Sequence, residues 1–446
     1  MRLLTSSIRH NSWKILWSLF FPVFIFALLE NGEKFVERIC LSHYSLDFLN
    51  GSMQAYALLQ FFQVSLVVFA NRISVFEGKT RALQIGNRVW QVIWLSILSM
   101  IVVLPFTPLI NICFFQEIGQ GEIAHRYFSI SLVGSFLCPI GAILSSFFRA
   151  VENKRFLLSS LIITVQASII LNLLLIPSFG VMGAAYSGLI AKLIFCAILL
   201  GRFLNRSNRE NYHTHEWKMD WPSIWHSIKS CDPKIIGRTF YCVSWMIMTY
   251  FMAAKGNLHL SVLSIGATLT FFIASFPQSL LQALSPVFSH EFRSQSYANA
   301  WKMFKSSLTC ALAFSGILAI PFLCFPKSIL FLFCSEIPLG VEYQLIATVY
   351  LAWVWILMRN LHPPFLFYLF SMQDETFYKR IRLFTHLLSI LQAGYFIYYL
   401  DWSPNTFWVI LCVECMILLS AYAARTYALG KEQIKKGIDK IEKTTH

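Results

Sequence analysis

Apolar stretches long enough to cross a lipid bilayer follow one another along almost the whole chain. A transmembrane helix needs about 20 mostly apolar residues, whereas a transmembrane barrel would show short strands of alternating polarity. Because lipid offers the backbone no hydrogen-bond partners, each stretch predicts a continuous helix. The twelve predicted spans are residues 15–39, 48–71, 89–115, 127–148, 156–176, 180–200, 235–254, 260–289, 307–333, 344–371, 383–400 and 406–429.

Basic residues alternate between the two sets of connections. Of the 36 Lys and Arg residues, 29 lie in the two tails and in the connections after the second, fourth, sixth, eighth and tenth predicted helices. The opposite connections hold only Arg38, Arg126, Lys255 and Lys327. Short cytoplasmic loops carry an excess of Lys and Arg. We therefore expect both termini in the cytoplasm, in an inner (cell) membrane, with the first apolar run retained as a helix rather than cleaved as a signal peptide.

The longest hydrophilic stretch falls after the sixth predicted helix and divides the spans into two sets of six. Prolines recur at similar depth in the third and ninth helices (Pro105, Pro321) and in the fourth and tenth (Pro139, Pro363). Six helices per half make both halves start on the same side, which is a parallel repeat. The predicted fold is all-α and polytopic, with two pseudo-symmetric six-helix lobes. The predicted domains are the N-terminal lobe 1–205, a cytoplasmic linker 206–233, the C-terminal lobe 234–430 and a basic tail 431–446.

Composition and motifs narrow the class of function. Hydrophobic residues make up 57% of the chain and charged residues 13%, so a soluble catalytic domain has little room. The net charge of +14 fits cytoplasmic loops beside anionic lipid, so we expect membrane lipids and no nucleic acid as partners. The sequence lacks a P-loop, GxGxxG and HExxH. We therefore expect no enzyme, no cofactor and no metal site; His213 and His215 alone do not make one, and Cys412 and Cys415 read as small hydrophobes.

Carboxylates inside predicted spans are the ion-coupling candidates, because charge in lipid is costly and usually functional. Glu30, Glu33 and Glu37 recur at helical spacing in the first span, and Glu414 lies in the last. One reading makes one of these carboxylates a proton or sodium site. The other makes them structural partners of Lys34 and of the neighbouring Arg38, which stand beside them on the same helix.

Cations and neutral polar residues inside spans are the candidates for a substrate cleft. Lys192, Arg359 and His362 lie deep in the sixth and tenth predicted helices. Lining a cleft, the two cations would favour anionic cargo or a phosphate head group; paired with Glu30 or Glu414, they would lock one conformation instead. The neutral candidates, which could equally bridge helices, are Gln54, Gln166, Asn172, Gln278 and Gln282.

The segment from Ile169 to Gly188 combines an Asn-containing helix, a short turn and a Gly-x-x-Gly-Ala-Ala start. It resembles the multidrug/oligosaccharidyl-lipid/polysaccharide (MOP) exporter superfamily, and Phe148–Phe156 looks like the segment that precedes it there. Length, helix count and duplication are most like the multidrug and toxic compound extrusion (MATE) branch. The turn Ile176–Gly180 is also similar to the one in lipid-linked sugar flippases. The segments Glu30–Arg38 and Tyr56–Phe62 together are similar to progressive ankylosis proteins. Packing of small residues is the alternative reading of the glycines.

The expected function is secondary active export of amphipathic organic compounds by H⁺ or Na⁺ antiport with alternating access. A flippase for a lipid-linked precursor and an organic-anion exporter are the alternatives. The expected partners are a small organic or lipid-linked substrate and membrane lipids, and the expected oligomeric state is a monomer.

Overall fold

The computed structural model describes residues 12–72, 85–115, 118–151, 153–222, 224–225, 233–293, 297–334, 340–372 and 374–444, and the regular elements in these ranges are all helices. The first half begins with α2 (Ser12–Tyr44) and α3 (Leu46–Arg72). A third helical segment follows, made of α4 (Ile85–Val103), η2 (Leu104–Phe106) and α5 (Thr107–Phe114). This half ends with α6 (Gly121–Ala150), α7 (Lys154–Phe179), α8 (Val181–Phe203) and the short α9 (Arg206–Tyr212).

The second half repeats this order. It begins with α11 (Pro233–Ala254) and with α12 (Asn257–Ile273), which continues into α13 (Ser275–Arg293). A segment of α14 (Tyr297–Ala319), the π-helix η3 (Ile320–Cys324) and α15 (Pro326–Leu330) follows. The half ends with α16 (Glu342–Ser371), α17 (Glu375–Gln392) with the π-helix η4 (Ala393–Tyr399), and α18 (Thr406–Thr444). In the described ranges each half therefore has six long helical segments, as predicted.

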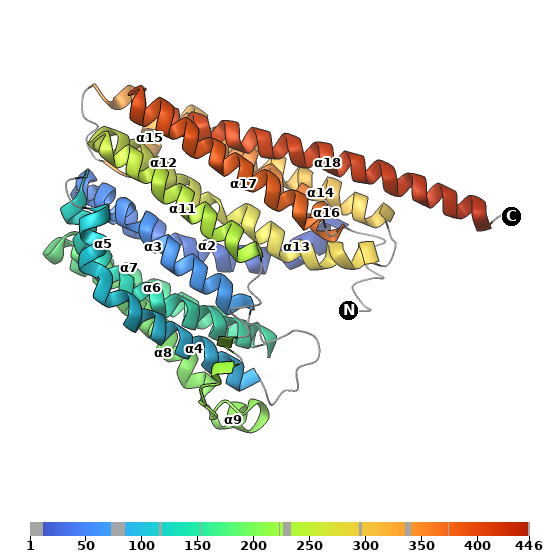
Figure 1. The fold of residues 1–446 in the computed structure, drawn as a ribbon, viewed down its shortest axis with the longest axis horizontal. Coiled ribbons are helices and arrows are strands. Elements are labelled where there is room, and N and C mark those ends of the chain that lie inside the picture. Colours follow the sequence, from blue (N-terminus) through green and yellow to red (C-terminus); the bar gives the residue numbers. More distant parts are fainter. Residues whose placement is uncertain are drawn as a thin grey trace.

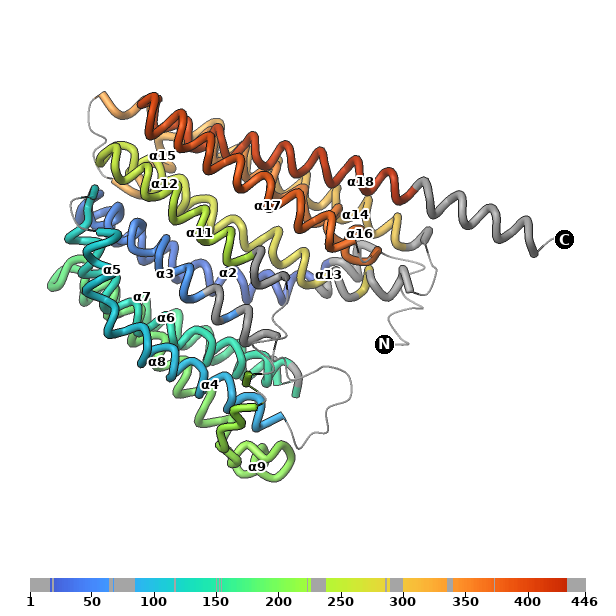
Figure 2. Tube along the Cα trace, viewed as in Figure 1, coloured from blue at the N-terminus to red at the C-terminus, as the bar shows by residue number. Residues whose placement is uncertain are grey.

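The two halves form two lobes (Figures 1 and 2). The elements α2 to α8 make one lobe and α11 to α18 the other. The ribbons of the two lobes approach each other at the end that carries α5 and α15 and diverge toward the end that carries α9. Across this junction α2 and α3 pack against α11, α12 and α13. The inner helices of one lobe thus provide its contact with the other.

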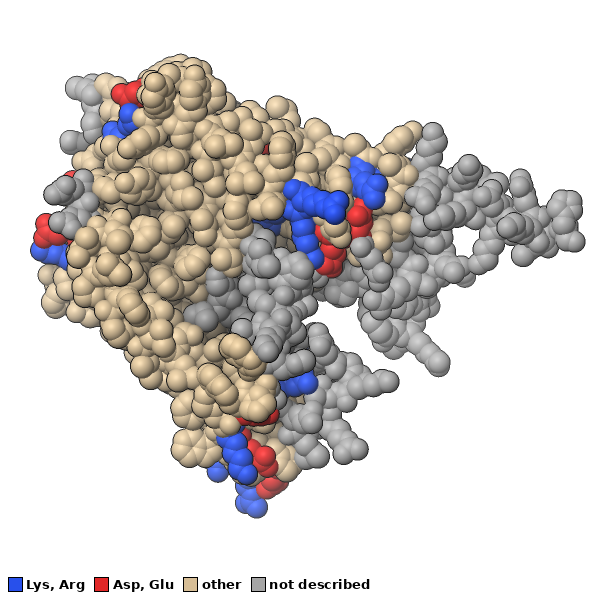
Figure 3. Space-filling view, in the orientation of Figure 1, with Lys and Arg blue, Asp and Glu red and all other residues tan. Residues whose placement is uncertain are grey.

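Eight of the described helices are long and apolar enough to cross a membrane. The remaining predicted spans correspond to α2, α3, α11 and α17. These helices carry polar side chains that lie inside the protein, as the sites below show, so their lower hydropathy reflects burial of polar groups and not exposure to water. In Figure 3 most of the visible surface is uncharged, and the Lys, Arg, Asp and Glu atoms drawn gather toward the two ends of the helices. The chain is an integral membrane protein.

Several helices are longer than the predicted spans. The span expected at 307–333 begins at Tyr297 and ends at Cys324, and the span expected from 383 begins at Glu375. Lys302, Lys305 and Arg382, which were expected in loops, therefore lie on helices. Long basic side chains at helix ends can reach the interface while their stems stay on apolar surface, so hydropathy alone places a helix end too far inward.

Prolines mark matching distortions in the two lobes. The helix that begins with α4 changes to 3₁₀ geometry at Pro105, and α14 changes to π geometry at Pro321. Proline cannot donate to the preceding turn and its ring crowds it, so each helix changes its winding there. After each distortion a short helix follows, α5 and α15 respectively. The predicted correspondence of the third and ninth helices therefore has a structural counterpart.

The segment predicted as a linker packs on the N-terminal lobe over its first part. Trp90 Nε1 donates to the Thr214 carbonyl at 2.8 Å, and Trp94 Nε1 donates to the Trp217 carbonyl at 3.0 Å. A Cβ at Gly86 would lie 2.5 Å from the Tyr212 carbonyl oxygen, so only glycine allows α4 to approach the end of α9 this closely. Residues up to Trp217 therefore lie against α4 instead of hanging free between the lobes.

Candidate functional site

Glu37 is the centre of a buried polar cluster in the N-terminal lobe. Its side chain is 2% exposed, and its carboxylate accepts from Lys34 Nζ at 2.5 Å and from Tyr127 Oη at 2.5 Å. Lys34 lies one turn before Glu37 on α2, whereas Tyr127 comes from α6. Arg38 lies over an aromatic ring, with its guanidinium 4.6 Å from the centre of the Tyr56 ring. The charges of the first span are thus partly paired, as the structural reading expected.

Glu33 extends this cluster toward α7. Ser168 Oγ donates to Glu33 Oε1 at 3.0 Å, and the Ser168 carbonyl in turn accepts from Ser187 Oγ of α8 at 3.0 Å. Asn172 lies one helical turn beyond Ser168 and is 1% exposed. Neither its Oδ1 nor its Nδ2 has a hydrogen-bond partner among the described residues. Since burying an amide without a partner costs free energy, Asn172 marks a position where an additional polar ligand would be stabilised.

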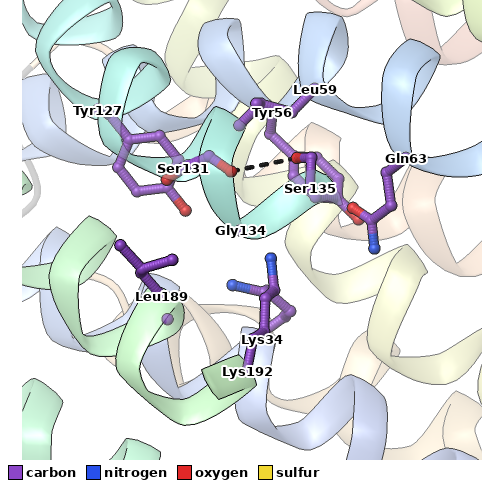
Figure 4. A pocket seen from close by; sticks show the side chains of 11 residues that line it. Lys34, Tyr56, Leu59, Gln63, Tyr127, Ser131, Gly134, Ser135, Leu189 and Lys192 are labelled. Carbon is purple, nitrogen blue, oxygen red and sulfur yellow. Dashed lines mark hydrogen bonds between the residues drawn. The ribbon is translucent and has the colours of Figure 1, made fainter. Parts of the chain in front are cut away.

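A small cavity lies beside this cluster, and two lysines point into it (Figure 4). Its volume is about 20 Å³, room for about one water molecule. Lys34 of α2 and Lys192 of α8 place their ammonium groups at the cavity, among Tyr56, Gln63 and Tyr127. Lys34 is neutralised by Glu37, but no carboxylate of the described residues forms an ion pair with Lys192. Of the two alternatives left open for Lys192, an ion pair with Glu30 or Glu414 is not found among the described residues, whereas a position at a cavity is, and this cavity carries net positive charge.

Glu30 is set apart from the Glu37 cluster. Its side chain is exposed on α2, and the charged groups that act on it are Arg149 of α6 and Glu33. Arg149 also lies 5.8 Å from the ring of Phe26, one turn before Glu30. Of the predicted coupling carboxylates on α2, Glu30 is thus the one open to solvent or lipid, while Glu37 is enclosed.

The C-terminal lobe holds a second buried polar network, built by α17 and α18. Glu414 is 9% exposed; its Oε1 lies 2.7 Å from His386 Nδ1, and its Oε2 accepts from Ser389 Oγ at 2.7 Å. Arg382 Nε donates to His386 Nε2 at 3.2 Å, and Arg382 Nη1 donates to Tyr378 Oη. Tyr378, Arg382 and His386 are spaced four residues apart, so they line one face of α17.

Arg359 and His362 lie on α16 next to this network. Arg359 has its guanidinium 5.7 Å from the Trp355 ring centre and forms no ion pair with the described residues. It acts on Glu414 through space, and the Arg359–Glu414 ion pair that the sequence left open as one alternative is not formed among the described residues. His362 is 3% exposed, and its Nε2 lies 3.2 Å from the Cys415 carbonyl oxygen.

The glutamines predicted for a cleft divide into three groups. Gln54 is buried and donates to the Ile118 carbonyl at 3.1 Å, so it joins α3 to the connection that precedes α6. Gln166 is exposed on the same face of α7 as Ile162 and Ile170, which is an outward apolar face. Gln278 and Gln282 are exposed one turn apart on α13. Because no large hydrophobic side chain described on α13 is exposed, this face of α13 is polar, as expected beside water.

Where the lobes converge, hydrogen bonds join them directly. Asn50 of α3 donates to Ser261 Oγ of α12 at 2.9 Å. Gln120, which precedes α6, donates to Asp47 Oδ1 and to Asn257 Oδ1, both at 2.9 Å. Farther along α2, Asn31 donates to Ser275 Oγ at 3.0 Å. The polar contacts at this end close it, while the opposite ends of the lobes diverge (Figure 1).

Sequence reasoning missed the partners that complete both networks, namely Tyr127, Ser168, Arg382, His386 and Ser389. Most of these are neutral and occur throughout the spans, so nothing in their type marks them. The exception is the spacing of Tyr378, Arg382 and His386, which a longer predicted helix would have placed on one face. Outside the membrane spans, His213, His215 and Glu216 bring ligand atoms within 4.8 Å of one another, and His213 already pairs with Glu216.

Comparison with known proteins agrees with this geometry. Residues 233–352 match the MatE family model, and no curated protein matches the sequence. The structure is similar to the inward-facing conformation of a multidrug resistance MATE family transporter of the MOP superfamily, with a TM-score of 0.76 at 15% identity over 90% of this chain and 95% of that chain. An outward-facing conformation of such a transporter gives a TM-score of 0.66 at 16% identity, over 96% and 98%.

A third similar structure comes from Pyrococcus furiosus and belongs to a MOP superfamily transporter described by the reverse polarity of its binding pocket. It has a TM-score of 0.64 and 15% identity, covering 95% of this chain and 98% of that one. At such identities the likeness establishes the fold, so the chain has the fold of MATE transporters. The MATE-like fold that the resemblance of the Ile169–Gly188 segment implied, with its two-lobed architecture, is confirmed at the level of the fold.

Proposed function

We propose that this protein is a secondary active exporter that moves amphipathic organic compounds across the cell (inner) membrane by H⁺ or Na⁺ antiport. The observation that carries the proposal is the arrangement of the lobes, joined by Asn50–Ser261 at one end and diverging at the end with the basic connections. By the distribution of Lys and Arg the diverging end is cytoplasmic. The greater likeness to an inward-facing than to an outward-facing transporter supports the same orientation.

Coupling to an ion requires groups that change charge or ligands inside the protein. The N-terminal lobe supplies Glu33, Glu37 and the unpartnered Asn172, and the C-terminal lobe supplies Glu414 with His386. A ligand shifts a two-state equilibrium only through different affinities for the two states. An ion that binds the cluster in one conformation and leaves it in the other would drive the lobes from inward- to outward-facing.

Uptake into proteoliposomes tests this proposal. Under an imposed proton or sodium gradient, a cationic dye should accumulate against its own gradient, and collapsing the gradient with an ionophore should abolish the accumulation. Glu33→Gln should remove the response to the gradient while the protein remains inserted. Ion-coupled export would be contradicted if liposomes without protein accumulated as much dye, or if dye accumulation did not depend on either ion gradient.

A second candidate cargo is an anion, either a soluble organic anion or the phosphate of a lipid-linked precursor. The observation that favours it is the position of the Lys192 ammonium beside Lys34 at the cavity, since neither Lys192 nor Arg359 of the other lobe has a carboxylate partner among the described residues. Coulomb attraction between charges 4 Å apart is about 4 kcal/mol at an effective dielectric constant of 20, enough to decide selectivity.

Neutralising both residues (Lys192→Met with Arg359→Met) separates the two cargoes. If the cargo is anionic, transport of a nucleotide or a phosphorylated lipid should fall and transport of a cationic dye should rise. Strong dye export in the unmodified protein that is lost in the double variant would assign the cations a structural role. Arg126→Met is the matched control, because Arg126 is a cation exposed at the outer end of α6 and pairs with Glu122.

A further inference from the structure

The imidazole of His386 is held between a cation and an anion inside the C-terminal lobe. Its side chain is 5% exposed, and its two ring nitrogens face Arg382 Nε at 3.2 Å and Glu414 Oε1 at 2.7 Å. Arg382 comes from the preceding turn of α17, and Glu414 from α18. The proposed function includes Glu414 and His386 among the coupling groups, but it does not define which atom of this network binds the ion or which contact that binding would break.

The two neighbours determine which ring nitrogen carries the proton. Arginine stays protonated in proteins and its Nε–H can only donate, so His386 Nε2 must be the accepting, unprotonated nitrogen. A neutral imidazole then carries its proton on Nδ1, which donates to the Glu414 carboxylate. The lone pair of Nε2 is therefore the one position at which the neutral imidazole can accept a proton. In this structure that lone pair accepts the hydrogen bond from Arg382 Nε.

We propose that His386 is a proton-binding site in the C-terminal lobe and that the proton competes with Arg382 for Nε2. When the proton binds, Nε2 becomes a donor, so the Arg382 Nε–H loses its acceptor and faces a second positive charge. Glu414 keeps the hydrogen bond from His386 Nδ1, but its single negative charge balances only one of the two cations, His386 and Arg382. The protonated state thus expels the Arg382 guanidinium from its place beside His386, and loss of the proton restores it.

The surroundings reinforce this competition. Besides Arg382 and Glu414, the titratable and charged side chains around His386 come from α11, α16, α17 and α18. They are Arg238, Tyr241, Cys242, Arg359, His362, Tyr378, Cys415 and Tyr422, each of which interacts electrostatically with Arg382 or Glu414. Among the described groups around His386, Glu414 is the only carboxylate. A proton added to His386 therefore increases a local excess of positive charge that no further described anion balances. Moving Arg382 away is the response the geometry allows.

Displacement of Arg382 would change the packing of α11, a helix that contacts the other lobe. The Arg382 guanidinium lies 5.4 Å from the ring of Tyr241 on α11, and the Tyr241 ring lies 5.3 Å from that of His386. The same helix α11 packs against α3 of the other lobe, which carries Asn50. A proton on His386 therefore alters the packing of an inter-lobe helix, which is what coupling to alternating access needs. This consequence rests on the proposed function, whereas proton binding itself does not.

The ligand of this site is a proton and not a metal cation. Sodium and other hard cations are bound by oxygen ligands. Both oxygens of Glu414 already accept hydrogen bonds from Ser389 and His386, and the guanidinium of Arg382 stands where a further cation would have to sit. An imidazole with one lone pair accepts a proton without needing any additional ligand.

Nuclear magnetic resonance of ¹⁵N-histidine in the full chain, embedded in lipid nanodiscs without cargo, tests the site. His386 is one of 11 histidines and is assigned by the signal that His386→Gln removes. We expect that signal to titrate with pH. In Arg382→Met the midpoint should move to higher pH by about one unit, a tenfold gain in proton affinity, because the competitor is gone. In Glu414→Gln the midpoint should move to lower pH, because the balancing carboxylate is gone.

Arg380→Met is the matched control, since Arg380 is a cation exposed on the same helix and should leave the midpoint unchanged. Arg382→Lys keeps the charge and should shift the midpoint less than Arg382→Met, which separates competition from misfolding. An unchanged or lowered midpoint in Arg382→Met would overturn the proposal. If His386 titrates as expected but the protein shows no gradient-driven transport, the proposed function is contradicted, whereas the proposed proton site is not.

Discussion

Asn50 and Ser261 are 211 positions apart in the chain, yet the Asn50 amide donates to the Ser261 hydroxyl at 2.9 Å and joins the two lobes. Both side chains are buried, at 0% and 7% exposure. A buried hydrogen bond between lobes exists only in the conformation that closes this end, so it stabilises that conformation over the one in which the end opens. The hydrogen bond from Gln120 to Asn257 also joins the lobes and acts in the same direction.

Removing this contact should therefore shift the protein toward the outward-facing state. For Asn50→Leu we expect a loss of about 1–3 kcal/mol of inter-lobe stabilisation, which changes the ratio of the two states about 5- to 150-fold. Spin labels at Glu122 and Tyr343, exposed near this end in the two lobes, should report longer distances in the variant. Ser52→Ala is the control, because the hydrogen bond that Ser52 donates among the described residues stays within its own helix, to the Leu49 carbonyl.

Glu37→Gln should destabilise the folded protein. The change leaves the Lys34 ammonium without its carboxylate in a buried cluster, and breaking a buried ion pair costs about 3–5 kcal/mol. Because Lys34 is 26% exposed, solvent screens part of this cost, and the lower end of that range is expected. Thermal unfolding of the purified protein measures the change. Glu30→Gln, on the same helix but exposed, should shift the midpoint much less; equal shifts would contradict the pairing seen here.

Gly266→Ala should also destabilise the protein, through crowding. A Cβ at position 266 would lie 2.2 Å from Cζ2 and 2.4 Å from Cε2 of Trp408. The indole cannot move freely, since its Nε1 donates to the Val262 carbonyl at 3.1 Å. Overpacking a core costs about 1–3 kcal/mol. Thermal unfolding should show this loss, whereas Gly316→Ala, where nothing lies within 4 Å of an added Cβ, should show none.

Cysteine labelling checks the orientation in the membrane. In a background without the native cysteines, Ser207→Cys on α9 should react with a membrane-impermeant maleimide only from the cytoplasmic side. Ser403→Cys, in the connection before α18, should react only from outside. Both side chains are exposed, so access is limited by the membrane alone. Labelling of both from one side would contradict the topology that the Lys and Arg distribution predicts. A third position predicted for such labelling, Ser296, lies outside the described residues.

The positions of the helices, their order and their division into two lobes were predictable from the sequence. These features depend on local quantities, since a run of apolar residues must be helical in lipid and basic connections stay on one side. The same locality explains the errors. The helix ends at Tyr297 and Glu375 were placed too far inward because their first turns are polar, although they continue the helix.

Which charged groups meet was decided only by the tertiary structure. Glu37 and Glu414 could be singled out by their cost in lipid, but their partners Tyr127 and His386 lie on other helices, 90 and 28 positions away. Whether two side chains touch depends on the rotation and relative height of two packed helices, and these follow from the packing of the whole lobe. Periodicity within one helix carries no information about that register, so the sequence left open whether Lys192 is paired or lines a cavity, and it did not indicate that Arg382 and Glu414 share His386.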